Sequence, residues 1–256
     1  MPTKLLDPYE IVAGSWKNLL KHWRVYAEFT VWFIFLSIVF WAFGVLTRSL
    51  IADKFLSNLL FSLMTLPLSL LTGVLIAAVI DATAKSLQGQ RPDVRDSLMI
   101  GAHKLIPFIW VSILMSLALI GGFVLVLVPA LIFAVWFAFA TDFLIVDGVR
   151  GSGALRKSKA LVAGRWWAVL FRIIIPWLFF YFAAKFALAL FYLLLGAVLG
   201  DPGMFFGAIP DIFAVPNLHL LVTTVAPQVF YGLTLPLYAA ANLILWFNLK
   251  KNPAVK

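Results

Sequence analysis

Few side chains in this sequence are suited to catalysis or metal binding. There is no cysteine, and the three histidines are His22, His103 and His219. None of them lies at metal-ligand spacing from another ligand. A zinc-protease motif, a serine-nucleophile motif and a phosphate-binding glycine loop are also missing from the sequence. We therefore predict no catalytic residue, no metal site and no cofactor.

Ionisable residues within long apolar stretches are better candidates for a function. A charged side chain at the centre of a membrane costs about 2.5–3.5 kcal/mol on insertion scales, so such residues are rarely kept without a role. Lys185 is the deepest of them. It is either a counter-ion for an anionic substrate or lipid phosphate, or a long side chain that reaches the outer headgroups. The complete set of ionisable candidates within the apolar stretches is Glu28, Asp81, Asp142, Arg172 and Lys185.

The four candidates other than Lys185 fall in the cytoplasmic third of their apolar stretches. Two interpretations are open. They converge into one polar cluster that gates a path or relays protons, in which case paired acids would have strongly shifted pKa values. Alternatively, they mark the ends of the spans and pair with Arg24, Arg165 and Lys85.

The amino-acid composition indicates to which class of protein this chain belongs. The 256 residues are 63% hydrophobic and only 12% charged, and the mean hydropathy is +1.02. Soluble domains carry about 25% charged residues, so this chain could not cover a water-soluble globule with polar surface. We predict one integral membrane domain over residues 1–256.

Hydropathy predicts six membrane spans in an all-α fold. A helix needs about 20 apolar residues to cross a bilayer core of about 30 Å. Gly121, Gly122 and Pro129 are the expected breakpoints that fold one overlong run into two spans. Pro67 predicts a kink, and Pro176 predicts a break or a tilt of an overlong span. The spans are 29–47, 59–83, 106–127, 130–146, 166–199 and 222–247.

Three amphipathic helices are predicted at 8–24, 94–105 and 153–165. Tryptophan and leucine follow one face of each helix at helical spacing, and basic residues follow another. Aromatic and apolar faces favour anionic lipid over nucleic acid as the partner. The candidate headgroup contacts are Lys17, Lys21, Arg156, Lys157, Lys159, Arg165 and Trp166.

The amphipathic helices resemble one another. Each carries an apolar stretch followed by a glycine, at Gly14, Gly101 and Gly164, and each precedes a span. We predict that these glycines permit a turn or close helix packing. The sequence thus divides into three units of a surface helix plus a two-span hairpin, at about 8–84, 92–147 and 151–249, in a pseudo-threefold arrangement.

Basic residues also predict the orientation. Outside the spans, every lysine and arginine lies on one side of the membrane except Arg48 and Lys54. By the positive-inside rule, both termini and the three surface helices face the cytoplasm of an inner or plasma membrane. The segment Gly200–Leu221 lies on the other side, as either a lid over an external pocket or an aromatic interfacial loop.

Part of the central stretch is similar to a known family. Pro129, the acid Asp147 and the segments Ala154–Ser158 and Leu161–Trp167 resemble the glycerophosphoryl diester phosphodiesterase membrane-domain family and its YciC-like relatives. The resemblance implies a prokaryotic polytopic membrane protein with the same helix-and-hairpin layout. The family pattern often has an arginine and a second proline where this chain has Trp136 and Asp142. The soluble catalytic domain fused in some members has no counterpart in this chain.

Three functions are consistent with the sequence. The first is a non-enzymatic membrane protein that binds or organises anionic lipid through its basic-aromatic helices. The second is a small transporter or channel with a polar path through Glu28, Asp81, Asp142 and Lys185. The third is an enzyme that acts on a lipid headgroup, which requires two polar groups within hydrogen-bond reach beside a lipid-sized groove.

Overall fold

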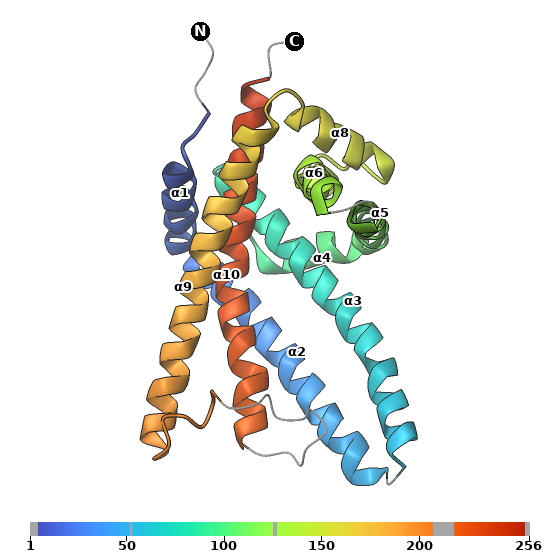
Figure 1. Cartoon of the computed structure of the whole chain (residues 1–256), viewed down its shortest axis with the longest axis vertical. Helices are drawn as coiled ribbons and strands as arrows, with labels where there is room; N and C mark the ends of the chain where they lie inside the picture. Colours follow the sequence, from blue (N-terminus) through green and yellow to red (C-terminus); the bar gives the residue numbers. More distant parts are fainter. Residues whose placement is uncertain (1–4, 52, 125–126, 207–217, 254–256) are drawn as a thin grey trace.

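The computed structural model describes residues 5–51, 53–124, 127–206 and 218–253, and this part of the chain contains helices and no strands (Figure 1). Six helices within it are long and apolar enough to cross a membrane. The protein is therefore an all-α, multi-pass membrane protein. The helices are α1 Pro8–Lys21, α2 Trp23–Leu50, α3 Lys54–Leu87, α4 Val94–His103, α5 Leu105–Val124, α6 Leu127–Phe137, α7 Ala140–Ile145, α8 Ser152–Val162, α9 Trp166–Val198 and α10 Leu218–Lys251.

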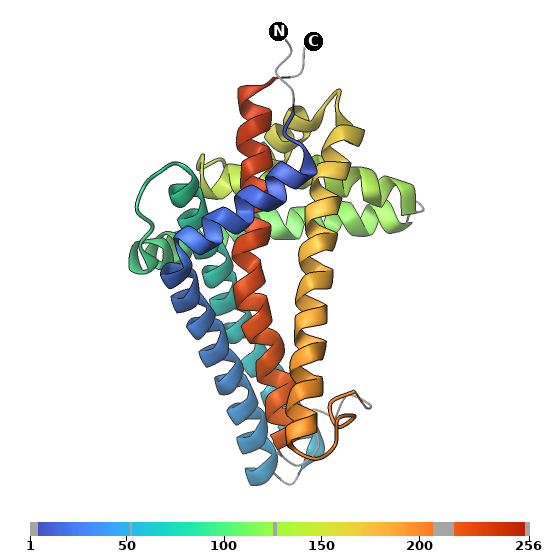
Figure 2. The same cartoon turned by 90° about the vertical axis from the view of Figure 1, so that its left-hand side faces the viewer.

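Four long helices, α2, α3, α9 and α10, run along the long axis of the molecule (Figures 1 and 2). Helix α10 contacts α2, α3 and α9, and its fully buried Leu243, Leu245, Trp246 and Leu249 form part of the core. The described ends of the chain lie at the same end of the molecule, which we call the terminal end. The short α2–α3 connection lies at the opposite end.

The six candidate membrane spans follow in the predicted order, and α2, α3 and α10 extend further at both ends than their predicted spans. The α2–α3 connection is shorter than the predicted loop 48–58 because Asp53 begins α3, with its carboxylate accepting a hydrogen bond from the Leu56 amide at 2.8 Å. Of the two alternatives predicted at Pro176, a break or a tilt, the break is wrong, since α9 continues through this residue. The fourth span is not one helix, because the chain leaves helical geometry between α6 and α7.

Along the chain, α1 is followed by α2 and α3, α4 by α5, α6 and α7, and α8 by α9 and α10. The hairpins that follow α1, α4 and α8 are not arranged alike. Figure 1 shows α5 and α6 end-on, and Figure 2 shows them lying across the long axis. The middle hairpin is therefore roughly perpendicular to the other two.

The repeated glycines have different environments. A Cβ atom on Gly101 would lie 2.5 Å from the Val74 carbonyl oxygen, so this glycine lets α4 pack directly on α3. A Cβ atom on Gly14 would lie 3.1 Å from the Ile244 side chain in α10. Gly164 has φ +77° and lies in the turn between α8 and α9.

Candidate functional site

Helix α1 presents three different faces. Ile11, Ser15 and Asn18 are buried against the protein. About one third of a turn away, Trp16 and Leu20 are half or more exposed. The remaining third carries exposed Lys17 and Lys21. With about 3.6 residues per turn, the helix directs one face to the protein and leaves an apolar face and a basic face exposed. Trp23 and Arg24, which are also exposed, begin α2.

The buried polar face of α1 is held by a hydrogen-bond network. The Asn18 amide donates to the Tyr26 hydroxyl at 2.8 Å. The Ser86 hydroxyl donates to the Asn18 amide oxygen at 3.0 Å and lies 3.2 Å from the Tyr26 hydroxyl. These bonds join α1 to α2 and α3, which fixes the direction in which the exposed Trp16 and Leu20 point.

Helix α8 is attached to the break between α6 and α7. The buried Ser158 hydroxyl accepts a hydrogen bond from the Phe139 amide at 3.1 Å and donates to the Trp136 carbonyl at 2.7 Å. It therefore satisfies two backbone groups that the interrupted helix leaves without partners. Ala154 and Val162 lie on the same buried face of α8.

The other face of α8 is basic and exposed. Arg156, Lys157 and Lys159 are all exposed. The Lys159 ammonium lies 4.1 Å from the centre of the Trp136 ring, a cation–π contact. Among the described residues, neither Arg156 nor Lys157 forms an ion pair. Two positive charges are thus available to a partner outside the chain.

Arg165 and Trp166 have contacts within the protein. The Arg165 guanidinium donates to the Leu249 carbonyl at 3.0 Å and to the Asn252 carbonyl, so it caps the C-terminal end of α10. Burial lowers the pKa of Arg165. The Trp166 indole donates to the Ile132 carbonyl at 3.4 Å, whereas the next residue, Trp167, is 66% exposed.

Asp81 belongs to a polar cluster where α3 meets α4. Its carboxylate lies 2.8 Å from the Lys85 ammonium and accepts a hydrogen bond from the Ser97 hydroxyl at 2.9 Å. Nearby, the Lys104 amine donates to the Ile145 carbonyl. Burial lowers the pKa of Lys104, while the charge of Asp81 opposes and that of Lys85 reinforces this shift. The predicted pairing of Asp81 with Lys85 is thus present.

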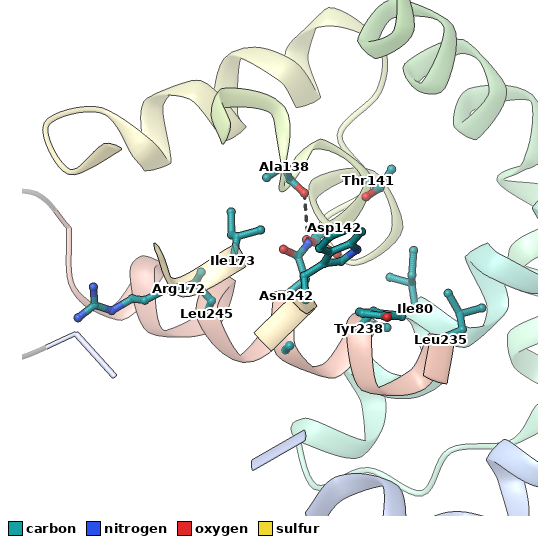
Figure 3. A pocket seen from close by; sticks show the side chains of 13 residues that line it. Ile80, Ala138, Thr141, Asp142, Arg172, Ile173, Leu235, Tyr238, Asn242 and Leu245 are labelled. Carbon is teal, nitrogen blue, oxygen red and sulfur yellow. Dashed lines mark hydrogen bonds between the residues drawn. The ribbon is translucent and has the colours of Figure 1, made fainter. Parts of the chain in front are cut away.

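Asp142 lies elsewhere, in a cavity of about 280 Å³ between α7, α9 and α10 (Figure 3). It is 2% exposed. Its carboxylate accepts a hydrogen bond from the Asn242 amide at 2.5 Å, and the same amide donates to the Ala138 carbonyl at 3.2 Å. Figure 3 shows the Arg172 side chain directed away from Asp142. The guanidinium instead donates to the Leu6 carbonyl at 2.7 Å.

Lys185 lines a second cavity of about 490 Å³, together with Tyr181, Gln228 and Tyr231. Its ammonium lies 5.7 Å from the centre of the Tyr181 ring. Trp177 and Tyr238 line both cavities, so the two are neighbours along α9 and α10.

The intramembrane candidates therefore do not form one cluster. Asp81 pairs with Lys85 within α3 and with Ser97 of α4, Asp142 pairs with α10, and Glu28 is exposed on α2. No group of three potential metal ligands occurs among the described residues. Sequence reasoning missed Asn242 and Ser158, because an uncharged polar residue within an apolar or amphipathic helix carries no signal of its partner. Within the predicted segment Gly200–Leu221, residues 207–217 lie outside the described residues.

Comparisons of this chain with protein-family models, with curated proteins and with solved structures find no match.

Proposed function

We propose that this protein is a non-enzymatic membrane protein that binds anionic lipid at its terminal end through α1 and α8. The observation that supports this most directly is the three-faced α1. Its tryptophan and leucine face lies beside its lysine face, which is the arrangement of an interfacial helix that contacts acyl chains and headgroups together.

Helix α8 supports the same function. Its exposed Arg156 and Lys157 lack partners among the described residues, and Trp167 at the start of α9 is also exposed. Each basic residue near an anionic membrane surface contributes about 1 kcal/mol to lipid attraction. In this proposal the terminal end faces the cytoplasm of an inner or plasma membrane, as the distribution of basic residues indicates.

Membership of the glycerophosphoryl diester phosphodiesterase membrane-domain family is part of the proposal. It rests on the motif between Pro129 and Trp167. In this chain the motif supplies the α6–α7 break, the exposed charges of α8 and the Arg165 cap of α10. It thus combines contacts that hold the fold with charges available to lipid.

Lipid selectivity around α8 tests the proposal. Because the chain has no cysteine, a donor fluorophore can be placed on Ser152→Cys alone. Energy transfer to acceptor-labelled phosphatidylglycerol is then compared with transfer to acceptor-labelled phosphatidylcholine in phosphatidylcholine vesicles. The double variant Arg156→Gln/Lys157→Gln removes about 2 kcal/mol of attraction, so the preference for phosphatidylglycerol should fall by about 30-fold.

Two controls accompany this experiment. Arg156→Lys/Lys157→Arg keeps both charges and should keep the preference. Lys54→Gln removes a charge at the opposite end and should leave the preference unchanged. Equal transfer to both lipids in the unmodified protein, or a preference that survives loss of both charges, would contradict the proposal.

A second candidate function is a transporter with a polar path. The two neighbouring cavities along α9 and α10 favour it, because one holds Asp142 and the other Lys185. Glu28 and Asp81 lie outside both linings, so the path would be shorter than the sequence predicts. If Asp142 relays protons, Asp142→Asn should abolish proton flux into proteoliposomes that contain a pH-sensitive dye. Flux that is the same in vesicles with this variant and in vesicles without protein would remove this candidate.

A further inference from the structure

The α5–α6 hairpin differs from the other long helices in its direction. It projects from the molecule across the long axis, whereas α2, α3, α9 and α10 run along that axis (Figures 1 and 2). A hairpin that crossed the same membrane as these four helices would have to run beside them. Its crosswise direction is therefore difficult to reconcile with a crossing.

The surface of this hairpin is apolar. From Leu105 to Thr141 the sequence has no charged residue. Side chains along its whole length are exposed, among them Ile113 at 43%, Leu117 at 61%, Val124 at 80% and Val128 at 63%. An apolar patch of this extent is not stable in contact with water. The surroundings of the hairpin must be hydrocarbon or another apolar surface.

The depth of the hairpin follows from its contacts with α3. A Cβ atom on Gly73 would lie 3.5 Å from the Leu105 side chain and 4.0 Å from that of Phe108, so the base of α5 packs at Gly73. Asn58 precedes the apolar part of α3. The distance along the helix axis from Asn58 to Gly73 is about 22 Å, because each residue adds about 1.5 Å. The hydrocarbon core is about 30 Å thick, or about 15 Å per leaflet. The base of α5 thus falls within the leaflet on the terminal side.

Helix α1 lies at a similar depth. It packs against α10 at Ile244, and the end of the hairpin region is joined to α10 at Asn242, one half-turn away. Both figures show α1 and the hairpin at the same level along the long axis. Since the faces of α1 are those of an interfacial helix, the level of the hairpin is at or just below the headgroups of one leaflet.

We propose that α5 and α6 do not cross the membrane but lie in its plane, within the terminal-side leaflet, with their exposed faces against the acyl chains of that leaflet. A helix of about 10 Å diameter fits within a leaflet of about 15 Å of hydrocarbon. The chain then crosses four times, through α2, α3, α9 and α10. The α4–α5 and α7–α8 connections keep their predicted side. Because the hairpin adds area to one leaflet only, it acts as a wedge in the bilayer.

Depth measurements along the hairpin test this inference. Nitroxide labels on the single cysteines Ile113→Cys, Leu117→Cys and Val124→Cys report depth through their relative accessibility to oxygen and to a water-soluble nickel complex, in phosphatidylcholine vesicles. Helix α9 offers a matched pair, Phe182→Cys and Leu193→Cys, which are also exposed and have the same separation as residues 113 and 124. A crossing helix changes depth by about 16 Å over this separation.

We expect the three hairpin labels to report one depth, within about a helix radius of 5 Å, and the two α9 labels to differ by about 16 Å. Depths that change steadily from 113 to 124 by as much as on α9 would overturn the inference. So would spin–spin broadening at Leu117→Cys, which would indicate that a second copy of the chain covers the hairpin in place of lipid. The vesicles contain no anionic lipid, so either result is independent of the proposed lipid selectivity.

Discussion

Gly122→Ala lowers the free energy of unfolding by about 3 kcal/mol, the upper part of the usual range for overpacked sites. The reason is the close approach of α5 and α6. A Cβ atom on Gly122 would lie 2.6 Å from both the Cα and the amide nitrogen of Ala130, and 3.0 Å from the carbonyl carbon of Pro129. These are backbone atoms, which cannot move aside as the end of a side chain can. The two helices must separate.

The adjacent glycine is a matched control. A Cβ atom on Gly121 meets nothing within 4 Å, so Gly121→Ala should leave stability unchanged or raise it slightly through better helix propensity. The measurement is unfolding by dodecyl sulfate in mixed micelles, followed by tryptophan fluorescence. Equal stability of the two variants would show that α5 and α6 do not approach as closely as described.

Asn242→Leu is expected to destabilise the protein by about 3 kcal/mol, because it leaves a buried acceptor without its donor. The Asp142 carboxylate is 2% exposed, and the Asn242 amide is its side-chain partner in the structure. The same substitution also removes the donor to the Ala138 carbonyl, at the break between α6 and α7. Both losses loosen the attachment of α7 to α10.

A double-mutant cycle separates this pairing from simple loss of packing. Asp142→Leu/Asn242→Leu removes both partners, so it should be more stable than Asn242→Leu alone. Thr234→Val is the control on α10, since among the described residues the Thr234 hydroxyl bonds only to backbone carbonyls of its own helix. A double variant whose losses simply add would indicate that Asp142 and Asn242 do not interact in the membrane.

These two sites lie at the two ends of the hairpin region. Gly122 and Ala130 hold α5 against α6, while Asp142 and Asn242 hold α7 against α10. The α6–α7 break between them is satisfied by Ser158. Together with the contacts of Leu105 and Phe108 with α3 and of Ile132 with Trp166, these sites anchor the base of the hairpin, which can then extend sideways into a leaflet.

The sequence by itself determined which segments are long apolar helices, and it predicts which helices are amphipathic. Both properties are local. A run of about 20 apolar residues identifies a membrane helix wherever it packs, and the spacing of Trp16 and Leu20 predicts an apolar helical face. The Gly164 turn and the Asp81–Lys85 pair likewise depend on residues close together in the chain.

The sequence could not determine how the helices are directed or which polar groups meet. Hydropathy alone does not distinguish a hairpin that crosses a bilayer from one that lies within a leaflet, because both require the same apolar surface. Asp142 and Asn242 are 100 positions apart, and Arg172 and Leu6 are 166 apart. Only the tertiary structure brings such residues together, since packing among α7, α9 and α10 decides which uncharged amide or carbonyl meets each buried charge.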